Sequence, residues 1–325
     1  MAEHLSRSLA KYRSALPQLN GGLFLTDGGI ETTLIFHDGF DLPYFAAFDL
    51  MNKREGRDVL RRYFTRYASI AKANKLGFVF ESPTWRASID WGEKLGYAAA
   101  AMEQVNKDSI LFLSALREEM ESAASPMVIS GCVGPRGDGY DPGAMMTAKQ
   151  AAAYHGQQIR AFADSAADMV TAITMTYAEE AIGLTRAAKA AGMPVAISFT
   201  VETDGRLPSG QSLKDAIEAV DAATDRGPAY FMINCAHPTH FEDALEAGEA
   251  WVTRIKGLRA NASRLSHAEL DEAEDLDEGN PAELGQQYRS LRGLLSHITV
   301  LGGCCGTDHR HVEAICHACT AREAA

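Results

Sequence analysis

The feature that most constrains the fold is an eightfold alternation of short apolar runs with longer segments of helical spacing. Near-continuous apolar runs that each precede a helix are typical of a parallel sheet covered on both faces. Eight such units predict a closed (β/α)8 barrel, the TIM barrel, as one domain over residues 1–325, with an open doubly wound sheet as the structural alternative. The runs are GLFLTD, GFVFES, MVISGC, DMVTAIT, VAISFT, YFMINC, IKGLRA and HITVLGG.

The segments between the runs carry apolar residues three and four positions apart, as one face of a helix requires. Residues 1–20 are polar and amphipathic, and a further helix is expected there. Residues 266–283, after the seventh run, are strongly acidic and are expected to form either a solvated loop or a lid or subunit contact over the barrel mouth. The covering helices are predicted over residues 57–75, 97–124, 147–167, 178–191, 212–225, 240–253, 282–296 and 309–321.

The charge of the chain excludes one class of partner. With 31 basic and 43 acidic residues, the formal net charge is −12, whereas a nucleic-acid-binding surface needs the opposite sign. The sequence has no apolar run of about 20 residues, as a membrane span would need, and its start lacks the apolar core of a secretion signal. We therefore expect a cytoplasmic protein with reduced thiols.

Three cysteines occur at the ends of predicted strands. The sixth run ends in Asn234 and Cys235, and the eighth is followed by the vicinal pair Cys304 and Cys305. A barrel gathers the carboxyl ends of its strands at one mouth, so these thiols can converge although they are far apart in sequence. Three thiolates and one open position are typical of a catalytic zinc site, and sulfur ligands favour zinc over magnesium or calcium. The alternative for a Cys-Cys pair is two small buried hydrophobic residues.

The other cysteines are expected to be structural. Cys132 ends the third run, where its neighbours indicate a packed position. Cys316 and Cys319 resemble a metal-binding CHAC motif, but they lie three positions apart on a predicted helix and are expected to pack in the core.

Five segments, in their order along the chain, resemble the homocysteine S-methyltransferase family, which includes enzymes that use betaine or S-methylmethionine. The segments are TDGGIETTL, GPRGDGY, ISFTVETDGRLPSGQSL, INCAHP and GGCCGTDHRHV, and the resemblance extends from about Leu23 to Ile315. It implies a (β/α)8 barrel with zinc held by three cysteines, here Cys235, Cys304 and Cys305.

The resemblance also implies substrate-binding residues at the first strand. Asp27 corresponds to the aspartate that binds the amino acid, and Gly28 and Gly29 correspond to backbone donors for its carboxylate. Asn234, beside the first cysteine, is a further candidate for substrate binding. Trp85, at the end of the second strand, could hold a cationic methyl donor by a cation–π contact or pack beneath the barrel rim.

The sequence departs from the family where the homocysteine ammonium is bound. A glutamate usually occupies the end of the fourth strand, but here the corresponding residue is Ile173. An isoleucine cannot pair with an ammonium group, and a charge buried without a partner is costly. Either Glu31 or Glu81 replaces the missing carboxylate, or the acceptor is a different thiol.

These observations predict a zinc-dependent S-methyltransferase that moves a methyl group from a sulfonium or betaine-type donor to a small thiol, by default homocysteine. A methyltransferase or demethylase acting on another thiol is the nearest alternative. A zinc hydrolase is a second, although catalytic zinc in hydrolases usually has His and carboxylate ligands. A redox or zinc sensor built on Cys304 and Cys305 is a third. The partners expected are small molecules, and association into a homo-oligomer stays open.

Overall fold

Eight parallel strands close into a barrel in the computed structural model, which describes residues 10–273 and 275–321. Each strand pairs with its sequence neighbours, and β1 also pairs with β8, so no edge is left open. The predicted TIM barrel is confirmed, and all eight predicted runs contain strands. The strands are β1 (Phe24–Leu25), β2 (Gly77–Glu81), β3 (Met127–Val133), β4 (Met169–Met175), β5 (Val195–Phe199), β6 (Tyr230–Asn234), β7 (Ile255–Ala260) and β8 (Val300–Gly303).

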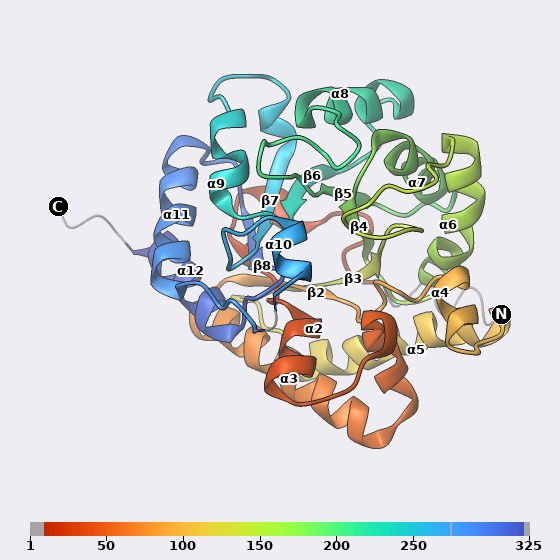
Figure 1. Ribbon diagram of the computed structural model, residues 1–325. Coiled ribbons are helices and arrows are strands. Elements are labelled where there is room, and N and C mark those ends of the chain that lie inside the picture. The colour runs from red at the N-terminus through yellow and green to blue at the C-terminus, as the bar shows by residue number, and fades with distance from the viewer. Residues whose placement is uncertain (1–9, 274, 322–325) are drawn as a thin grey trace.

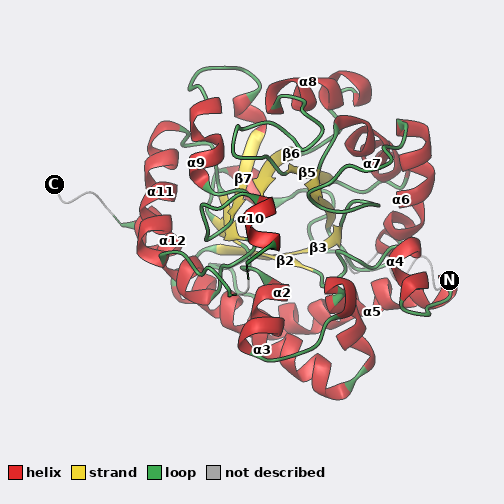
Figure 2. Ribbon diagram, viewed as in Figure 1, coloured by secondary structure: helices red, strands yellow, loops and turns green. Residues whose placement is uncertain are grey.

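Helices surround the strands, as Figure 1 and Figure 2 show. None of the helices in the described part of the chain is long and apolar enough to cross a membrane. The α-helices are α2 (Ile30–Thr32), α3 (Arg54–Ala73), α4 (Ile89–Lys94), α5 (Ala99–Met120), α6 (Ala148–Ala163), α7 (Ala178–Ala190), α8 (Leu213–Thr224), α9 (Pro238–Phe241), α10 (His267–Asp271), α11 (Pro281–Leu294) and α12 (His309–Thr320). The residues that the structure describes also form a π-helix (Thr33–His37) and five 3-10 helices (Pro17–Asn20, Pro43–Phe45, Ala47–Asn52, Glu242–Ala244 and Val252–Arg254).

The helix predicted over residues 240–253 is wrong. The chain forms only the short α9 and two 3-10 turns there. Gly248 has a left-handed backbone, with φ of 98°, which ends any helix that reaches it. The turn allows Trp251 to be buried in the core.

The N-terminal helix predicted over residues 1–20 is also wrong where it can be compared, since residues 1–9 lie outside the described part. Residues 10–16 form turns and bends, and Pro17–Asn20 is a 3-10 helix. Arg13 donates hydrogen bonds to the carbonyl oxygens of Ala163, Ser165 and Ala167, which holds the segment against the end of α6. These tertiary contacts outweigh the local amphipathic pattern.

Side chains alternate along each strand between the barrel interior and the covering helices. An apolar cluster fills the interior at the amino end of the strands, where Leu16 joins it from below. Two residues further along the strands, the inward positions become polar and stay buried: Thr26, Glu81, Ser130, Thr171, Ser198 and Arg259. The interior is therefore polar directly beneath the carboxyl ends, where barrel active sites lie.

Candidate active site

Three cysteines converge at the carboxyl ends of β6 and β8. Cys235 follows β6 directly, and Cys304 and Cys305 follow β8. The structure joins Cys235 to Cys304 as a disulfide, with their Cα atoms 5.4 Å apart, and Cys305 Sγ lies 3.8 Å from Cys235 Sγ. The three sulfurs lie within 4.8 Å of one another. We call these residues the cysteine cluster; within it, Cys304 is bonded to Cys235 and not to its sequence neighbour.

The donor set of the cysteine cluster fits zinc once the disulfide is reduced. Tetrahedral zinc with Zn–S bonds of about 2.3 Å places neighbouring sulfurs about 3.8 Å apart. The sulfurs of Cys235 and Cys305 already lie at 3.8 Å. Cys304 and Cys305 are partly exposed, so a fourth ligand has access to the cluster. Burial raises the pKa of the Cys305 thiol, so without a metal this thiol holds its proton.

The backbone near the cysteine cluster is strained at two residues. Cys235 has φ of 53° and Thr174, at the end of β4, has φ of 65°. Side chains other than glycine rarely adopt this left-handed region, which costs of order 1–3 kcal/mol and occurs preferentially at functional sites. The contact between Thr174 Oγ1 and Cys235 Sγ, at 4.0 Å, places both strained residues at the cluster.

Asn234 organises the site from within. Its Oδ1 accepts hydrogen bonds from Thr174 N at 2.9 Å and Ser198 Oγ at 2.6 Å, and its Nδ2 donates to Thr174 Oγ1 at 2.9 Å and Cys304 Sγ at 3.8 Å. An asparagine amide has two donors and two acceptor positions, so all of them are used. Asn234 thus connects β4, β5 and the cysteine cluster, and its contact with a substrate stays a prediction.

The glycines of the site act mainly through close packing. A Cβ at Gly29 would lie 2.6 Å from the carbonyl oxygen of Cys304, so only glycine fits there. The amide of Gly29 donates to the carbonyl oxygen of Thr307 at 3.0 Å, so this predicted carboxylate donor is already engaged. Gly28 accepts hydrogen bonds at its carbonyl from Tyr63 and Arg259.

Asp27 is held by the protein itself. Arg259 Nη2 lies 2.8 Å from Asp27 Oδ1, and the Tyr63 hydroxyl donates to Asp27 Oδ2 at 2.9 Å. All three side chains are buried. An ammonium group of a substrate would therefore share Asp27 with the permanent positive charge of Arg259.

The two other candidate carboxylates differ in their surroundings. Glu81 is buried in the polar interior, where Thr171 Oγ1 donates to its Oε1 at 2.9 Å, and its Oε2 has no hydrogen-bond partner among the described residues. Glu31, on α2, is partly exposed and close enough to Cys305 to raise the pKa of that thiol. Burial raises the pKa of both carboxyl groups to about 7. Glu31 is thus the more accessible of the two from the mouth.

Trp85 and Ile173 lie together at the mouth. Trp85 Nε1 donates to the carbonyl oxygen of Ile173 at 3.4 Å. The guanidinium of Arg86 lies 4.0 Å from the Trp85 ring centroid and 3.8 Å from that of Trp91. Arg86 therefore already makes one cation–π contact with the Trp85 ring. Only the part of the ring that Arg86 leaves uncovered could hold a methyl donor, as the sequence predicts.

Two residues at the cysteine cluster were not predicted from sequence. The hydroxyl of Tyr140, in the loop after β3, lies 3.3 Å from Cys305 Sγ. His267, the first residue of α10, contacts the backbone of Cys235. The only signals were the tyrosine of the GPRGDGY segment and a histidine within the acidic segment 266–283, neither of which identifies a partner.

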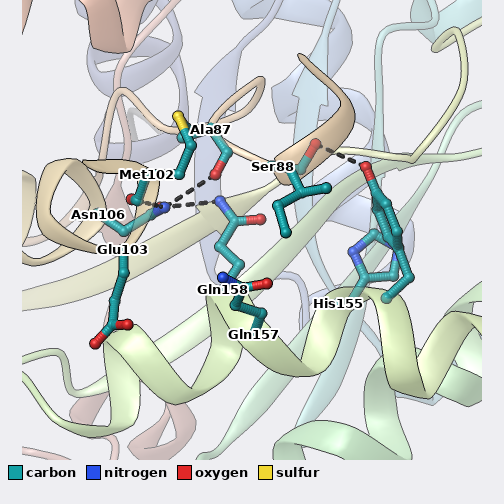
Figure 3. A pocket seen from close by; sticks show the side chains of 10 residues that line it. Ala87, Ser88, Met102, Glu103, Asn106, His155, Gln157 and Gln158 are labelled. Atoms are coloured by element: carbon teal, nitrogen blue, oxygen red, sulfur yellow. Dashed lines mark hydrogen bonds between the residues drawn. The ribbon is translucent and has the colours of Figure 1, made fainter. Parts of the chain in front are cut away.

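The remaining cysteines and a cavity beside α5 and α6 lie apart from the cysteine cluster. Cys316 is buried in the core and Cys319 packs against it, as predicted, and Cys132 is buried at the end of β3. A cavity beside α5 and α6 (Figure 3) is crossed by hydrogen bonds such as that from Gln158 Nε2 to Asn106 Oδ1 at 3.0 Å. Its lining contains no cysteine, so we assign it a packing role.

The barrel and its family match define a methyltransferase enzyme. The model of the homocysteine S-methyltransferase family matches residues 24–319, and the chain belongs to that family. Among curated proteins, none is matched by the sequence.

Crystal structures of the homocysteine methyltransferase MmuM from Escherichia coli are similar to this chain. The oxidized form has 19% identity and a TM-score of 0.73, and covers 94% of this chain and 99% of its own. The metallated form has 17% identity and a TM-score of 0.71, with coverage of 93% and 98%. At these identities the similarity establishes the fold.

Proposed function

We propose that the protein is a zinc-dependent S-methyltransferase that transfers a methyl group to a small thiol, by default homocysteine. The observation that carries the proposal is the convergence of three cysteine sulfurs within 4.8 Å at the barrel mouth. Zinc bound there by Cys235, Cys304 and Cys305 would deprotonate a guest thiol and keep it nucleophilic at neutral pH. Family membership supports the reaction class.

The residues of the chain prepare the site for such a guest. Asn234 orients Cys304 through its amide, and Gly29 allows the loop after β1 to approach Cys304 closely. The buried polar layer beneath the cysteine cluster excludes bulk water from the barrel interior. A fixed thiol and a donor aligned above it would react without the entropy cost of an encounter in solution.

We assign the ammonium of homocysteine to Glu31. Ile173 cannot bind it, Glu81 lies deeper in the barrel, and Asp27 is paired with Arg259. Glu31 is the remaining acidic candidate, and it follows Gly29 by two residues, where the chain packs against the carbonyl oxygen of Cys304. A sulfonium or betaine-type donor would enter from the partly exposed side of the cluster, near Trp85.

A second candidate acceptor is a thiol without an α-ammonium group. Two groups that could bind a zwitterion are already paired within the protein, which favours this acceptor. Arg259 neutralises the carboxylate of Asp27, and the amide of Gly29 donates to the carbonyl oxygen of Thr307. Together with Ile173, these contacts leave fewer groups for a zwitterion than the family pattern implies.

The test is a direct assay of the reduced, zinc-loaded protein. Metal content is measured first; methionine formation is then followed with homocysteine and, separately, S-methylmethionine or glycine betaine. One zinc per chain together with methionine formation is the expected result. Full transferase activity in metal-free protein would reject the mechanism, and turnover of 3-mercaptopropionate but not of homocysteine would favour the second acceptor.

A further inference from the structure

Tyr140 and His267 meet above the cysteine cluster from two separate loops. Tyr140 belongs to the loop between β3 and α6, and His267 begins α10 after β7. Their rings stack with centroids 3.8 Å apart and an angle of 28° between the planes. The Tyr140 hydroxyl then reaches Cys305 Sγ at 3.3 Å. The His267 ring thus supports the face of the Tyr140 ring and directs the Tyr140 hydroxyl toward Cys305.

His267 is itself fixed on both sides. Its Nε2 lies 2.7 Å from the carbonyl oxygen of Cys235, and its Nδ1 lies 3.0 Å from Glu202 Oε1. Its side chain is buried. A capping box, in which Ser266 and Glu269 exchange hydrogen bonds, fixes the start of α10. The histidine therefore connects the acidic segment to the backbone of one cysteine and to the ring that touches another.

We propose that Tyr140 and His267 are positioning residues of the cysteine cluster: His267 holds the Tyr140 ring in place, and Tyr140 donates a hydrogen bond to the Cys305 sulfur. The inference rests on the proposed function, because a metal-bound thiolate has no proton to donate and must be the acceptor. A hydrogen bond stabilises the negative charge of a thiolate and holds the sulfur in its binding orientation. It also draws electron density from the sulfur. Mutation of a residue that forms a hydrogen bond to a metal ligand typically lowers metal affinity about 10–100-fold.

The inference also gives the acidic segment 266–283 a place in the site. Figure 1 shows α10 in front of the barrel strands, inside the ring of helices. Ser263 Oγ donates to Asp277 Oδ2 at 2.6 Å, which ties the segment to the chain that follows β7. Of the two sequence-based alternatives, the buried contacts of His267 favour a cover over the mouth.

Tyr140→Phe is the sharpest test, because it removes only the hydroxyl and keeps the stacked ring. Zinc affinity is measured by competition with a chromophoric chelator and is expected to fall about 10–100-fold. In the cobalt-substituted protein, the sulfur-to-metal charge-transfer band is expected to move to lower energy, because one thiolate loses its hydrogen bond. Tyr44→Phe, at a tyrosine 49% exposed, is the matched control and is expected to change neither measurement.

His267→Ala tests the support of the ring. It is expected to shift the charge-transfer band of the cobalt-substituted protein. His267→Phe keeps an aromatic face against Tyr140 and is expected to bring the band part of the way back to its wild-type energy. His240→Ala is the control, since His240 binds the carbonyl oxygen of Arg264 at 2.9 Å. If His267→Ala fails to fold, Tyr140→Phe decides the question.

The role of Tyr140 and the metal centre can be overturned separately. Wild-type affinity and an unchanged band in Tyr140→Phe would overturn the inference and leave the proposed function standing. A reduced wild-type protein that takes up neither zinc nor cobalt would overturn the proposed metal centre, and the inference with it.

Discussion

Arg259 on β7 and Asp27 at the end of β1 form a buried ion pair, with Nη2 and Oδ1 2.8 Å apart. The arginine reaches past β8, where its Nε donates to the carbonyl oxygen of Gly303 at 3.1 Å. A side chain at residue 302 would overlap Thr26, so β8 can carry only glycine there. The pair thus connects the first and seventh strands directly beneath the cysteine cluster and sets the charge available to a substrate.

Arg259→Met is expected to destabilise the protein by about 3–5 kcal/mol, because it leaves the Asp27 carboxylate buried without its partner. The measurement is the free energy of unfolding in urea. Combining it with Asp27→Asn is expected to recover part of the loss, since no uncompensated charge is left. Additive losses in the double variant would show that the two side chains are not coupled.

Cys304→Ala is expected to abolish stoichiometric zinc binding and methyl transfer together, because the two thiolates that remain are too few to hold the metal. Metal analysis and a methionine-formation assay are made on the same preparation. Cys319→Ala, which alters a thiol on α12 away from the barrel mouth, is the control and is expected to keep both. Full activity in Cys304→Ala would reject the mechanism.

Glu31→Gln is expected to weaken homocysteine binding at least tenfold at pH 8 while leaving the binding of 3-mercaptopropionate unchanged. Only the ionised carboxylate pairs with an ammonium group, and burial raises the pKa of Glu31 to about 7. The wild-type advantage over the variant should therefore shrink as the pH falls below about 7. Calorimetry on zinc-loaded protein at several pH values measures it, and a pH-independent ratio would count against Glu31.

Ile173→Glu is expected to tighten homocysteine binding, because it restores a carboxylate at the end of β4, near Trp85. Equal affinities in the variant and the native protein would show that residue 173 does not choose the acceptor. The same titration with 3-mercaptopropionate, which has no ammonium group, controls for a general effect on the site.

Glu81 is expected to make stability depend on pH. Burial raises the pKa of the folded-state carboxyl to about 7, above its ordinary value of 4.5, so the folded protein keeps a proton that the unfolded chain releases. Its contribution is full below pH 4.5 and is lost as pH rises to 7, by at most about 1.4 kcal/mol per pH unit. Glu81→Gln should flatten the unfolding free energy across this range, whereas Glu246→Gln, at an exposed residue, should not.

Local pattern determined the architecture. The eight apolar runs and most of the helices follow from residue spacing, which depends on neighbours a few positions away. The same pattern placed Cys235, Cys304 and Cys305 at strand ends, and closure of the barrel was enough to bring them together. It failed at residues 10–20 and 240–253, where Arg13 and Gly248 override the helical spacing.

Only the tertiary structure decided which side chains contact the residues at the strand ends. The sequence could not show that Asp27 is neutralised by Arg259, that the amide of Asn234 is saturated, or that Tyr140 and His267 reach the cysteine cluster. Each of these contacts joins segments far apart in sequence, through side-chain directions that no periodicity encodes. Spacing along the chain fixed the strand ends, and the packing of separate loops at the mouth determined what their side chains can bind.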